Sequence, residues 1–242
     1  DIKVETAEKF CLSALKKYPK DIKINRSLGR INFIKEEYEK SYNFFNPIQN
    51  VDSYSLYMLS DMYLYGKYVK QDLNKSFKLI KQSADLNYKG ALIGIVSYYK
   101  NGTGTKANID LALSSLKKCA RFNHSDCLFD LALIYENGSY GEKKDLAKSL
   151  TYINKLVDKD DVYGYFLLGT HLIENAESET DIRNGLSNCK LANGSCDAYL
   201  IDYYLFSEDY KFFNKIFKNK SENKLKALEL FQNLIENIDE EN

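Results

Sequence analysis

The sequence has no tryptophan, two prolines, two histidines and twelve glycines among its 242 residues. So few prolines and glycines argue against an all-β chain, which needs many turns, and favour long helices. The sequence also contains no apolar run near the roughly 18 residues that a membrane-spanning helix requires. Lys plus Arg and Asp plus Glu both number 34. Because the net charge is therefore zero, we expect neither nucleic acid nor an anionic membrane as a partner.

Motifs that carry chemistry are missing as well. There is no G-x-S-x-G nucleophile elbow and no C-x-x-C redox pair. The stretch GTGTK (102–106) lacks the spacing and the ending of a phosphate-binding loop. His124 is expected in a turn, and His171 is expected to pack between helices. We therefore predict that the protein is not an enzyme and binds no metal or cofactor.

A repeat of 36 residues is the strongest pattern present. Three segments end in Gly66, Gly102 and Gly138, and each has a tyrosine three residues and an aliphatic residue seven residues before the glycine. These positions are Tyr63, Tyr99 and Tyr135, and Leu59, Ile95 and Leu131. Such offsets place the side chains on one helical face, and a glycine directly after that face is typical of a helix end.

A second amphipathic stretch follows each glycine after a loop. Asp72, Asp110 and Asp145 precede these stretches, and we expect each to cap a second helix. The pattern continues with Asn175 in place of the glycine and with Leu168, Gly169 and Leu172 aligned to the core. It then becomes irregular, with an inserted aromatic segment (207–222). We predict about five helical hairpins over 53–242 and an N-terminal helical cap over 1–52.

The third of these segments resembles the Sel-like repeat, a relative of the tetratricopeptide repeat. In CARFNHSDCLFDLALIYENGSYGEKKDLAKS (119–149), Leu131 and Ala132 stand at the Leu-Gly position of that repeat, and Tyr135 and Gly138 match it directly. The resemblance implies an all-α, right-handed solenoid of antiparallel helical hairpins. The N-terminal cap is similar to a tetratricopeptide hairpin, with Leu28 and Gly29 at its small-residue contact.

The cysteine pairs Cys119/Cys127 and Cys189/Cys196 add a second resemblance. Each pair spans the turn between two hairpins, which is similar to the cysteine-rich, exported, disulfide-bonded Sel-like proteins of bacteria. A continuous helix would hold residues eight apart about 12 Å from each other, so bonding requires a break, and Asn123 is a suitable turn residue. A zinc site using His124 and free thiols in a reducing compartment are the alternatives. Cys11 is expected as a buried, unpaired residue.

The resemblance to tetratricopeptide-like arrays also indicates a binding surface. There the inner wall is formed by first-helix residues lying 12, 9, 5 and 2 positions before the repeat glycine. Those positions mix aromatic and charged residues, which suits a protein partner. The candidate partner-binding residues are Tyr54, Tyr57, Asp61, Lys100, Asp126, Phe129, Glu136, Phe166 and Asp202.

A non-catalytic, protein-binding scaffold is the function that these features favour. The cysteine-rich resemblance implies export to the periplasm or beyond, with the signal peptide removed. It leads to the hypothesis of an immunity protein that docks on and neutralises a secreted toxic effector, such as a lipase. An exported cell-wall or β-lactam binding protein and an intracellular signalling adaptor are the alternatives. We expect a monomer in the absence of the partner.

Overall fold

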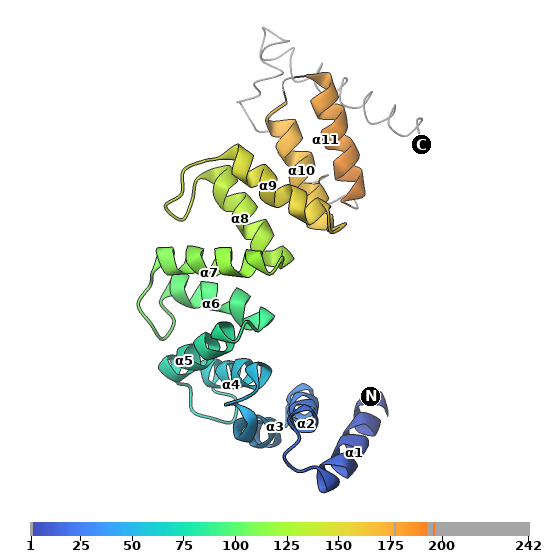
Figure 1. Ribbon diagram of the computed structural model, residues 1–242, viewed down its shortest axis with the longest axis vertical. Coiled ribbons are helices and arrows are strands. Elements are labelled where there is room, and N and C mark those ends of the chain that lie inside the picture. Colours follow the sequence, from blue (N-terminus) through green and yellow to red (C-terminus); the bar gives the residue numbers. More distant parts are fainter. Residues whose placement is uncertain (1, 177, 193–195, 197–242) are drawn as a thin grey trace. The chain divides into compact units, whose positions relative to one another are not determined.

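The computed structural model describes residues 2–176, 178–192 and 196. These residues form eleven α-helices and one short 3-10 helix, η1, in the order shown in Figure 1. The helices are α1 (Ile2–Lys17), α2 (Ile22–Ile34), α3 (Tyr38–Phe45), η1 (Asn46–Ile48), α4 (Ser53–Tyr65), α5 (Leu73–Asp85), α6 (Lys89–Asn101), α7 (Ile109–Arg121), α8 (Ser125–Asn137), α9 (Leu146–Val157), α10 (Val162–Glu174) and α11 (Glu179–Leu191). The all-α class predicted from the sequence is confirmed.

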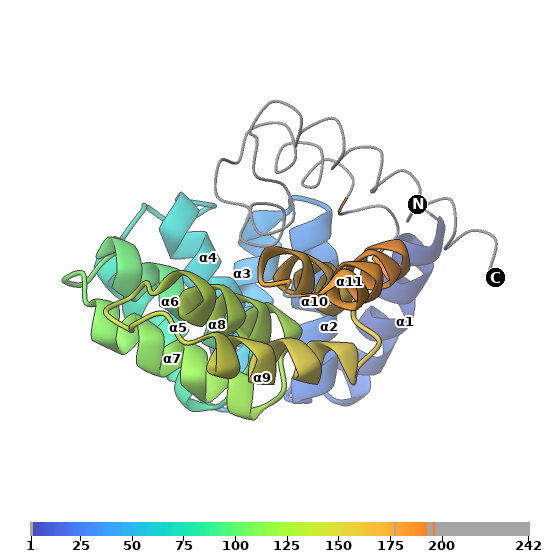
Figure 2. The ribbon, with the colours of Figure 1, turned by 90° about the horizontal axis from the view of Figure 1, so that it is seen from above.

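The chain divides into two compact units, Asp1–Cys127 and Leu128–Asn242, called here the N-terminal and the C-terminal unit. In the N-terminal unit, α2 packs on α3, α4 on α5 and α6 on α7, so that consecutive helices form hairpins. In the C-terminal unit, α9 packs on α10, and α10 lies beside α11 in both views (Figures 1 and 2). None of the described helices is long and apolar enough to cross a membrane.

The repeat glycines end the first helix of each hairpin, as the sequence predicts. Gly66, Gly102 and Gly138 have φ angles of 68°, 72° and 67°, a left-handed conformation that costs glycine little. Asn175 is different, because its φ of −106° ends α10 without that turn. The 36-residue spacing therefore reflects the left-handed residue that ends the first helix of three hairpins. In the fourth hairpin, α10 ends without such a residue.

The predicted core positions are buried in the first three hairpins. Leu59, Ile95 and Leu131 are each at most 4% exposed. In the fourth hairpin the prediction is wrong for Leu168 and Leu172, which are half-buried, while Leu167 and Ile173 enter the core. The reason is that α11 packs on α10 along a line through Gly169 and Ile173, where the two backbones approach closely.

The second helices begin at polar caps. Asp72 and Asp145 accept hydrogen bonds from the backbone N–H groups of Lys75 and Lys148, at 2.9 and 3.0 Å. The predicted cap Asp110 is wrong, because the Asn108 side chain accepts the equivalent bond from Leu111 at 2.9 Å. An asparagine oxygen caps a helix as well as an aspartate does, and Asp110 lies in the first turn of α7, where its charge suits the helix dipole.

The N-terminal cap contains the predicted small-residue contact. A Cβ atom on Gly29 would lie 2.5 Å from Cε1 of Phe45, so that only glycine lets α2 approach α3 this closely. Phe45 is completely buried. Ser41 donates a 2.8 Å hydrogen bond to the Gly29 carbonyl oxygen across the same contact.

Both predicted disulfides are present. Cys119 and Cys127 are bonded with their Cα atoms 5.9 Å apart, and Cys189 and Cys196 with theirs 5.4 Å apart. The helix breaks between Cys119 and Cys127 at Asn123, whose φ is 57°, and this is the turn that the bond requires. The disulfides exclude zinc ligation and free thiols at these four positions. Cys11 is free and half-buried.

Candidate functional site

Two groups of the candidate partner-binding residues lie close to other side chains of interest, one group in each unit. Tyr54, Tyr57 and Asp61 of α4 lie in the N-terminal unit. Glu136 of α8 and Phe166 of α10 lie beside a cavity in the C-terminal unit. Asp202 and the aromatic insertion over 207–222 lie outside the described residues.

In the N-terminal unit, Tyr54, Tyr57, Asp61 and Tyr88 form what we call the tyrosine cluster. The Tyr88 ring meets the rings of Tyr54 and Tyr57, with centroids 5.7 and 5.2 Å apart. A Cβ on Gly90 would lie 2.8 Å from the Tyr88 ring and 3.4 Å from that of Tyr57. Glycine at this position therefore makes room for the rings, which remain half-buried.

Asp61 is the charged member of the tyrosine cluster. Its carboxylate is half-buried, and burial raises its pKa from 3.8 to about 6, against a smaller opposing effect of Lys67. Burial, followed by the charge of Asp61, likewise raises the pKa of Tyr57 to about 12. A carboxylate whose ionisation is penalised in this way is a common feature of functional sites.

Two further predicted residues of the N-terminal unit, Lys100 and Asp126, are exposed. Neither belongs to the ring contacts of the tyrosine cluster. The predicted surface in this unit therefore consists of a compact aromatic and acidic cluster on α4, accompanied by separate exposed charges on α6 and α8.

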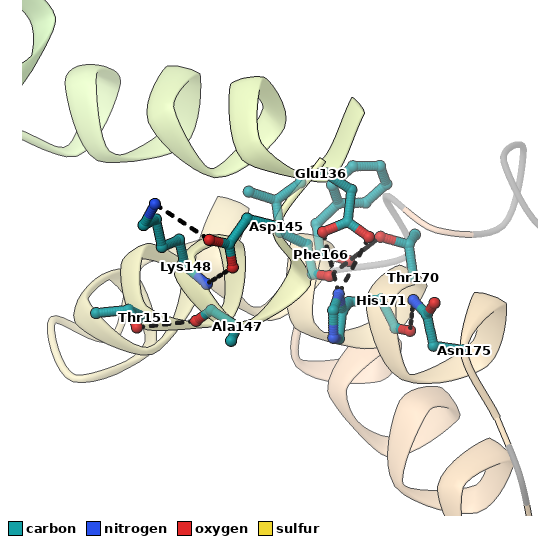
Figure 3. Close-up of polar contacts among 10 residues, drawn as sticks. Glu136, Asp145, Ala147, Lys148, Thr151, Phe166, Thr170, His171 and Asn175 are labelled. Atoms are coloured by element: carbon teal, nitrogen blue, oxygen red, sulfur yellow. Dashed lines mark hydrogen bonds and ion pairs between the residues drawn. The ribbon is translucent and has the colours of Figure 1, made fainter. Parts of the chain in front are cut away.

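In the C-terminal unit, a cavity of about 200 Å³ opens among α8, α9 and α10. We call it the α8–α10 cavity. Its lining residues are Ala132, Leu133, Glu136, Asn137, Ser149, Ile153, Phe166, Leu167, Thr170, His171 and Glu174. Figure 3 shows the contact between Glu136 of α8 and His171 of α10.

The Glu136–His171 pair is the central polar contact of the α8–α10 cavity. His171 Nδ1 lies 3.2 and 3.1 Å from the two carboxylate oxygens of Glu136. The side chain of His171 is 11% exposed and that of Glu136 is 15% exposed. Burial alone would raise the pKa of Glu136, but the bonds from His171 and Ser149 and the charges of His171 and Lys144 outweigh it and lower that pKa.

Glu174, the second carboxylate of the cavity, has the opposite environment. Burial, followed by the nearby charge of Glu136, raises the pKa of Glu174, and the charges of Lys144 and His171 oppose this only weakly. Glu174 makes no ion pair with any residue in the part of the chain that the structure describes. The cavity therefore contains one carboxylate with a partner and one without.

Ser149 lies near the N-terminal end of α9 and is completely buried. Its Oγ has no hydrogen-bond partner that meets normal geometry, although the hydroxyl is close enough to Glu136 to help lower its pKa. Thr170 is different, because its hydroxyl donates to the backbone of its own helix, at the carbonyl oxygens of Phe166 and Leu167. Ser149 is thus a buried hydroxyl with unused hydrogen-bonding capacity.

Phe129 is the remaining predicted residue of the C-terminal unit. Its ring packs edge to face on that of Tyr163, with the centroids 5.6 Å apart, and it does not line the cavity. Phe166 does line it, together with Leu133 and Leu167. The polar groups of the cavity therefore stand beside an apolar wall.

Sequence reasoning missed His171, Glu174, Ser149 and Tyr88 as site residues. His171 was expected only to pack between helices, and it does pack, but through a charged contact. Glu136 and His171 are 35 residues apart, which places them on facing turns of successive first helices, and this spacing is a signal that the 36-residue repeat contains. For Ser149 we find no sequence signal, since a serine at that repeat position also fits plain packing.

Among the residues that the structure describes, no group of three His, Cys, Asp or Glu side chains could hold a metal ion. The geometry instead suits the binding of a group that complements two carboxylates.

A family model for the Sel1 repeat matches residues 53–88, 91–114 and 125–161. No curated protein matches the chain in sequence. These three segments contain α4, α5, α8 and α9, most of α6 and the first half of α7, and they include the tyrosine cluster and the α8 and α9 walls of the cavity.

Solved structures show the same fold. The chain is similar to the Sel1 repeat protein from Oxalobacter formigenes, with a TM-score of 0.63 and 20% identity over 85% of this chain and 82% of the other. It is also similar to a protective antigen of uropathogenic Escherichia coli strains that displays an SLR fold. That match has a TM-score of 0.64 and 18% identity, and it covers 88% of this chain but 48% of the other. The chain thus spans about half the length of the second protein.

Proposed function

Because three segments of the chain match the Sel1 repeat, we propose that it is a non-catalytic scaffold that binds another protein through the exposed faces of its first helices. Repeat scaffolds of this kind present side chains of successive helices to a partner. The observation that carries the proposal is the tyrosine cluster, in which the rings of Tyr54 and Tyr57 contact that of Tyr88 and the charge of Asp61 acts on all three tyrosines.

Tyrosines of this kind suit a protein interface. Each ring offers a large, rigid apolar surface with a polar tip, so it can be covered by a partner at a low cost in conformational entropy. Asp61 gains from the same contact, because a positive charge supplied by the partner would favour the ionised form of a carboxylate whose burial Lys67 only partly offsets. The cluster thus combines an aromatic anchor with a charge that a partner can complete.

The finer proposal is that the protein is exported and acts as an immunity or inhibitor protein. One disulfide connects α7 to α8 and a second joins Cys189 of α11 to Cys196, and such bonds persist in oxidising compartments. A rigid, stapled scaffold that docks on a secreted toxic effector, for example a lipase, and covers its active site would protect the producing cell. Both histidines make side-chain contacts, since His171 pairs with Glu136 and His124 stacks on Phe122.

The experiment is a capture from the extracytoplasmic fraction with three matched baits: the wild type, Tyr57→Ala and Tyr18→Ala. Tyr18 is 62% exposed and lies between α1 and α2, away from α4, so Tyr18→Ala controls for the loss of a tyrosine. A specific partner is enriched by the wild type and by Tyr18→Ala and is depleted with Tyr57→Ala. If no captured protein shows this pattern, the proposal is contradicted.

The immunity proposal is tested in cells. Secreted effectors encoded beside the gene are expressed in the periplasm of a test bacterium with and without this protein. The proposal expects that co-expression restores growth for one effector and that Tyr57→Ala weakens the rescue. Growth that stays inhibited with every such effector contradicts the immunity role but leaves the binding scaffold to be judged by the capture experiment.

A further inference from the structure

The α8–α10 cavity carries an inference of its own. Its volume of about 200 Å³ exceeds the roughly 30 Å³ that one water molecule occupies in the liquid. The cavity therefore has room for the end of an organic side chain. Its walls come from α8, α9 and α10, so helices rather than loops fix the positions of its polar groups.

The charge of the cavity is unbalanced. Glu136 is matched by His171 at 3.1 Å, whereas Glu174 has no ion-pair partner among the described residues. A half-buried carboxylate without a partner is costly to the fold, and a cation placed between Glu174 and Glu136 would remove that cost. An anion would instead meet two like charges, so anionic ligands are disfavoured.

Ser149 lies in the cavity lining beside Glu136. Its hydroxyl helps to lower the pKa of Glu136, and its Oγ is itself buried. The cavity group that remains without a partner is therefore the Glu174 carboxylate, and a group with several N–H donors can bond both of its oxygens.

The apolar wall indicates the shape of that occupant. The cavity is not a purely polar site, because Leu133, Phe166 and Leu167 also line it. An ammonium or guanidinium group that is carried on an aliphatic stem fits both halves, since the stem packs on apolar side chains while the charged end reaches the carboxylates. A metal ion does not fit, because the described residues provide no group of three ligands.

We propose that the α8–α10 cavity receives a lysine or arginine side chain of the partner protein, with Glu174 and Glu136 around its charged end and Phe166 and Leu133 along its stem. This inference rests on the proposed function, because the side chain belongs to the bound protein. It adds a second, charge-specific anchor to the aromatic anchor of the tyrosine cluster.

The test uses small probes and needs no partner. The purified full chain is titrated with N-acetyl-lysine methylamide and with its uncharged analogue, N-acetyl-norleucine methylamide, at low ionic strength. Amide chemical shifts are followed by NMR. We expect the lysine probe to shift the resonances of residues that line the cavity and to bind at least about tenfold more tightly than the norleucine probe, since each hydrogen bond to a charged group adds to affinity.

Two variants locate the effect. Glu174→Gln keeps the shape of the side chain but removes its charge, and it is expected to weaken the binding of the lysine probe about tenfold. Asp158→Asn removes an equally negative but exposed charge at the end of α9 and is expected to leave the affinity unchanged. Circular dichroism confirms that both variants are folded.

Equal binding of the two probes, or no shift at the cavity with either of them, overturns the proposal. So does an unchanged affinity of Glu174→Gln for the lysine probe. Once a partner has been captured, Glu174→Gln should also weaken the binding of that partner. If the variant binds the partner normally while the lysine probe still depends on Glu174, the occupant is a free amine rather than a partner side chain, and the assignment to the partner is overturned.

Failure of this inference is distinct from failure of the proposed function. The probe titration reports on the cavity alone, whereas the capture with Tyr57→Ala reports on the N-terminal unit. If the binding of the partner depends on Tyr57 but not on Glu174, the scaffold function is supported and the cavity takes no part in it.

Discussion

His171 Nδ1 lies 3.1 Å from Glu136 Oε2, and this contact joins α10 to α8 at the edge of the α8–α10 cavity. Both side chains are largely buried. A short contact between two ionisable groups in such a place is expected to couple the stability of the C-terminal unit to pH, because the folded state holds Glu136 in its charged form.

The first prediction concerns this pair. The pKa of Glu136 is lowered in the fold because His171 and Ser149 outweigh burial, so the stabilising contribution is present above the unfolded pKa of 4.5 and is lost as the pH falls through the lower folded value. His171→Leu removes the partner and should raise the pKa of Glu136 and destabilise the protein by about 1–3 kcal/mol at neutral pH. Thermal unfolding between acidic and neutral pH measures this.

A double-mutant cycle provides the control. In Glu136→Gln with His171→Leu, the carboxylate that would lose its histidine partner is itself removed, so the double variant should lose less stability than the sum of the single variants. If the losses simply add, the pair makes no specific contribution and the account of the contact is wrong.

The second prediction concerns Asp61. Burial raises its pKa from 3.8 to about 6, so the folded state binds the proton more tightly than the unfolded state, and stability falls as the pH rises from about 4 to 6. At 1.36 kcal/mol per pH unit the penalty is at most about 3 kcal/mol, and partial exposure reduces it to about 1 kcal/mol. Asp61→Asn should therefore be more stable than the wild type above pH 6 and equal to it below about pH 4.

The matched control for Asp61 is Asp110→Asn. Asp110 is exposed in the first turn of α7, so its replacement should cost only a few tenths of a kcal/mol through the helix dipole, whereas the curves of Asp61→Asn and the wild type should separate between about pH 4 and 6. Urea unfolding at a series of pH values distinguishes the two variants. A wild type that is more stable than Asp61→Asn at pH 8 contradicts the prediction.

The third prediction concerns the disulfides. The unreduced, unfolded protein should contain one reactive thiol, that of Cys11, because the other four cysteines are paired. Replacing Cys119 and Cys127 together by serine should lower the free energy of unfolding by about 2–3 kcal/mol, as expected for a loop this short. Thiol titration and mass spectrometry without reductant count the free thiols. Five thiols in protein from an oxidising compartment would contradict the pairing.

The fourth prediction concerns Gly169. A Cβ atom there would lie 2.9 Å from the carbonyl oxygen of Gly185 and 2.6 Å from Sγ of Cys189, so Gly169→Ala should push α11 away from α10 and cost about 1–3 kcal/mol. The control is Gly94→Ala. Its Cβ would meet the end of the Ile80 side chain at 2.9 Å and the Tyr57 ring at 3.9 Å, an ordinary contact distance, and alanine is the better helix former, so the stability of the variant should be unchanged or higher.

Much of the fold could be predicted from the sequence because its signals are local. The left-handed glycines at 66, 102 and 138, the buried Leu59 and the turn at Asn123 each follow from the requirements of one backbone position. The fourth hairpin was predicted less well, because the burial of Leu167 and Ile173 depends on how closely α11 approaches Gly169, and this is a property of two helices together.

The candidate sites were predicted only in part. The repeat register placed Tyr54, Tyr57 and Asp61 on one face, and their clustering follows from spacing along one helix. The α8–α10 cavity depends instead on side chains from three helices, so Ser149 and Glu174 could not be selected without knowing which side chains point into the same space. Tyr88 lies between two helices and acquires its role from its ring contacts with α4.

The most direct test of the scaffold account is the affinity of the captured partner for the wild type, Tyr57→Ala and Tyr18→Ala, measured by calorimetry at one salt concentration. Buried aromatic anchors typically contribute 2 kcal/mol or more to an interface, so we predict that Tyr57→Ala binds roughly thirtyfold more weakly and that Tyr18→Ala binds as the wild type does. Equal affinities for all three proteins would contradict the claim that this face of α4 binds the partner.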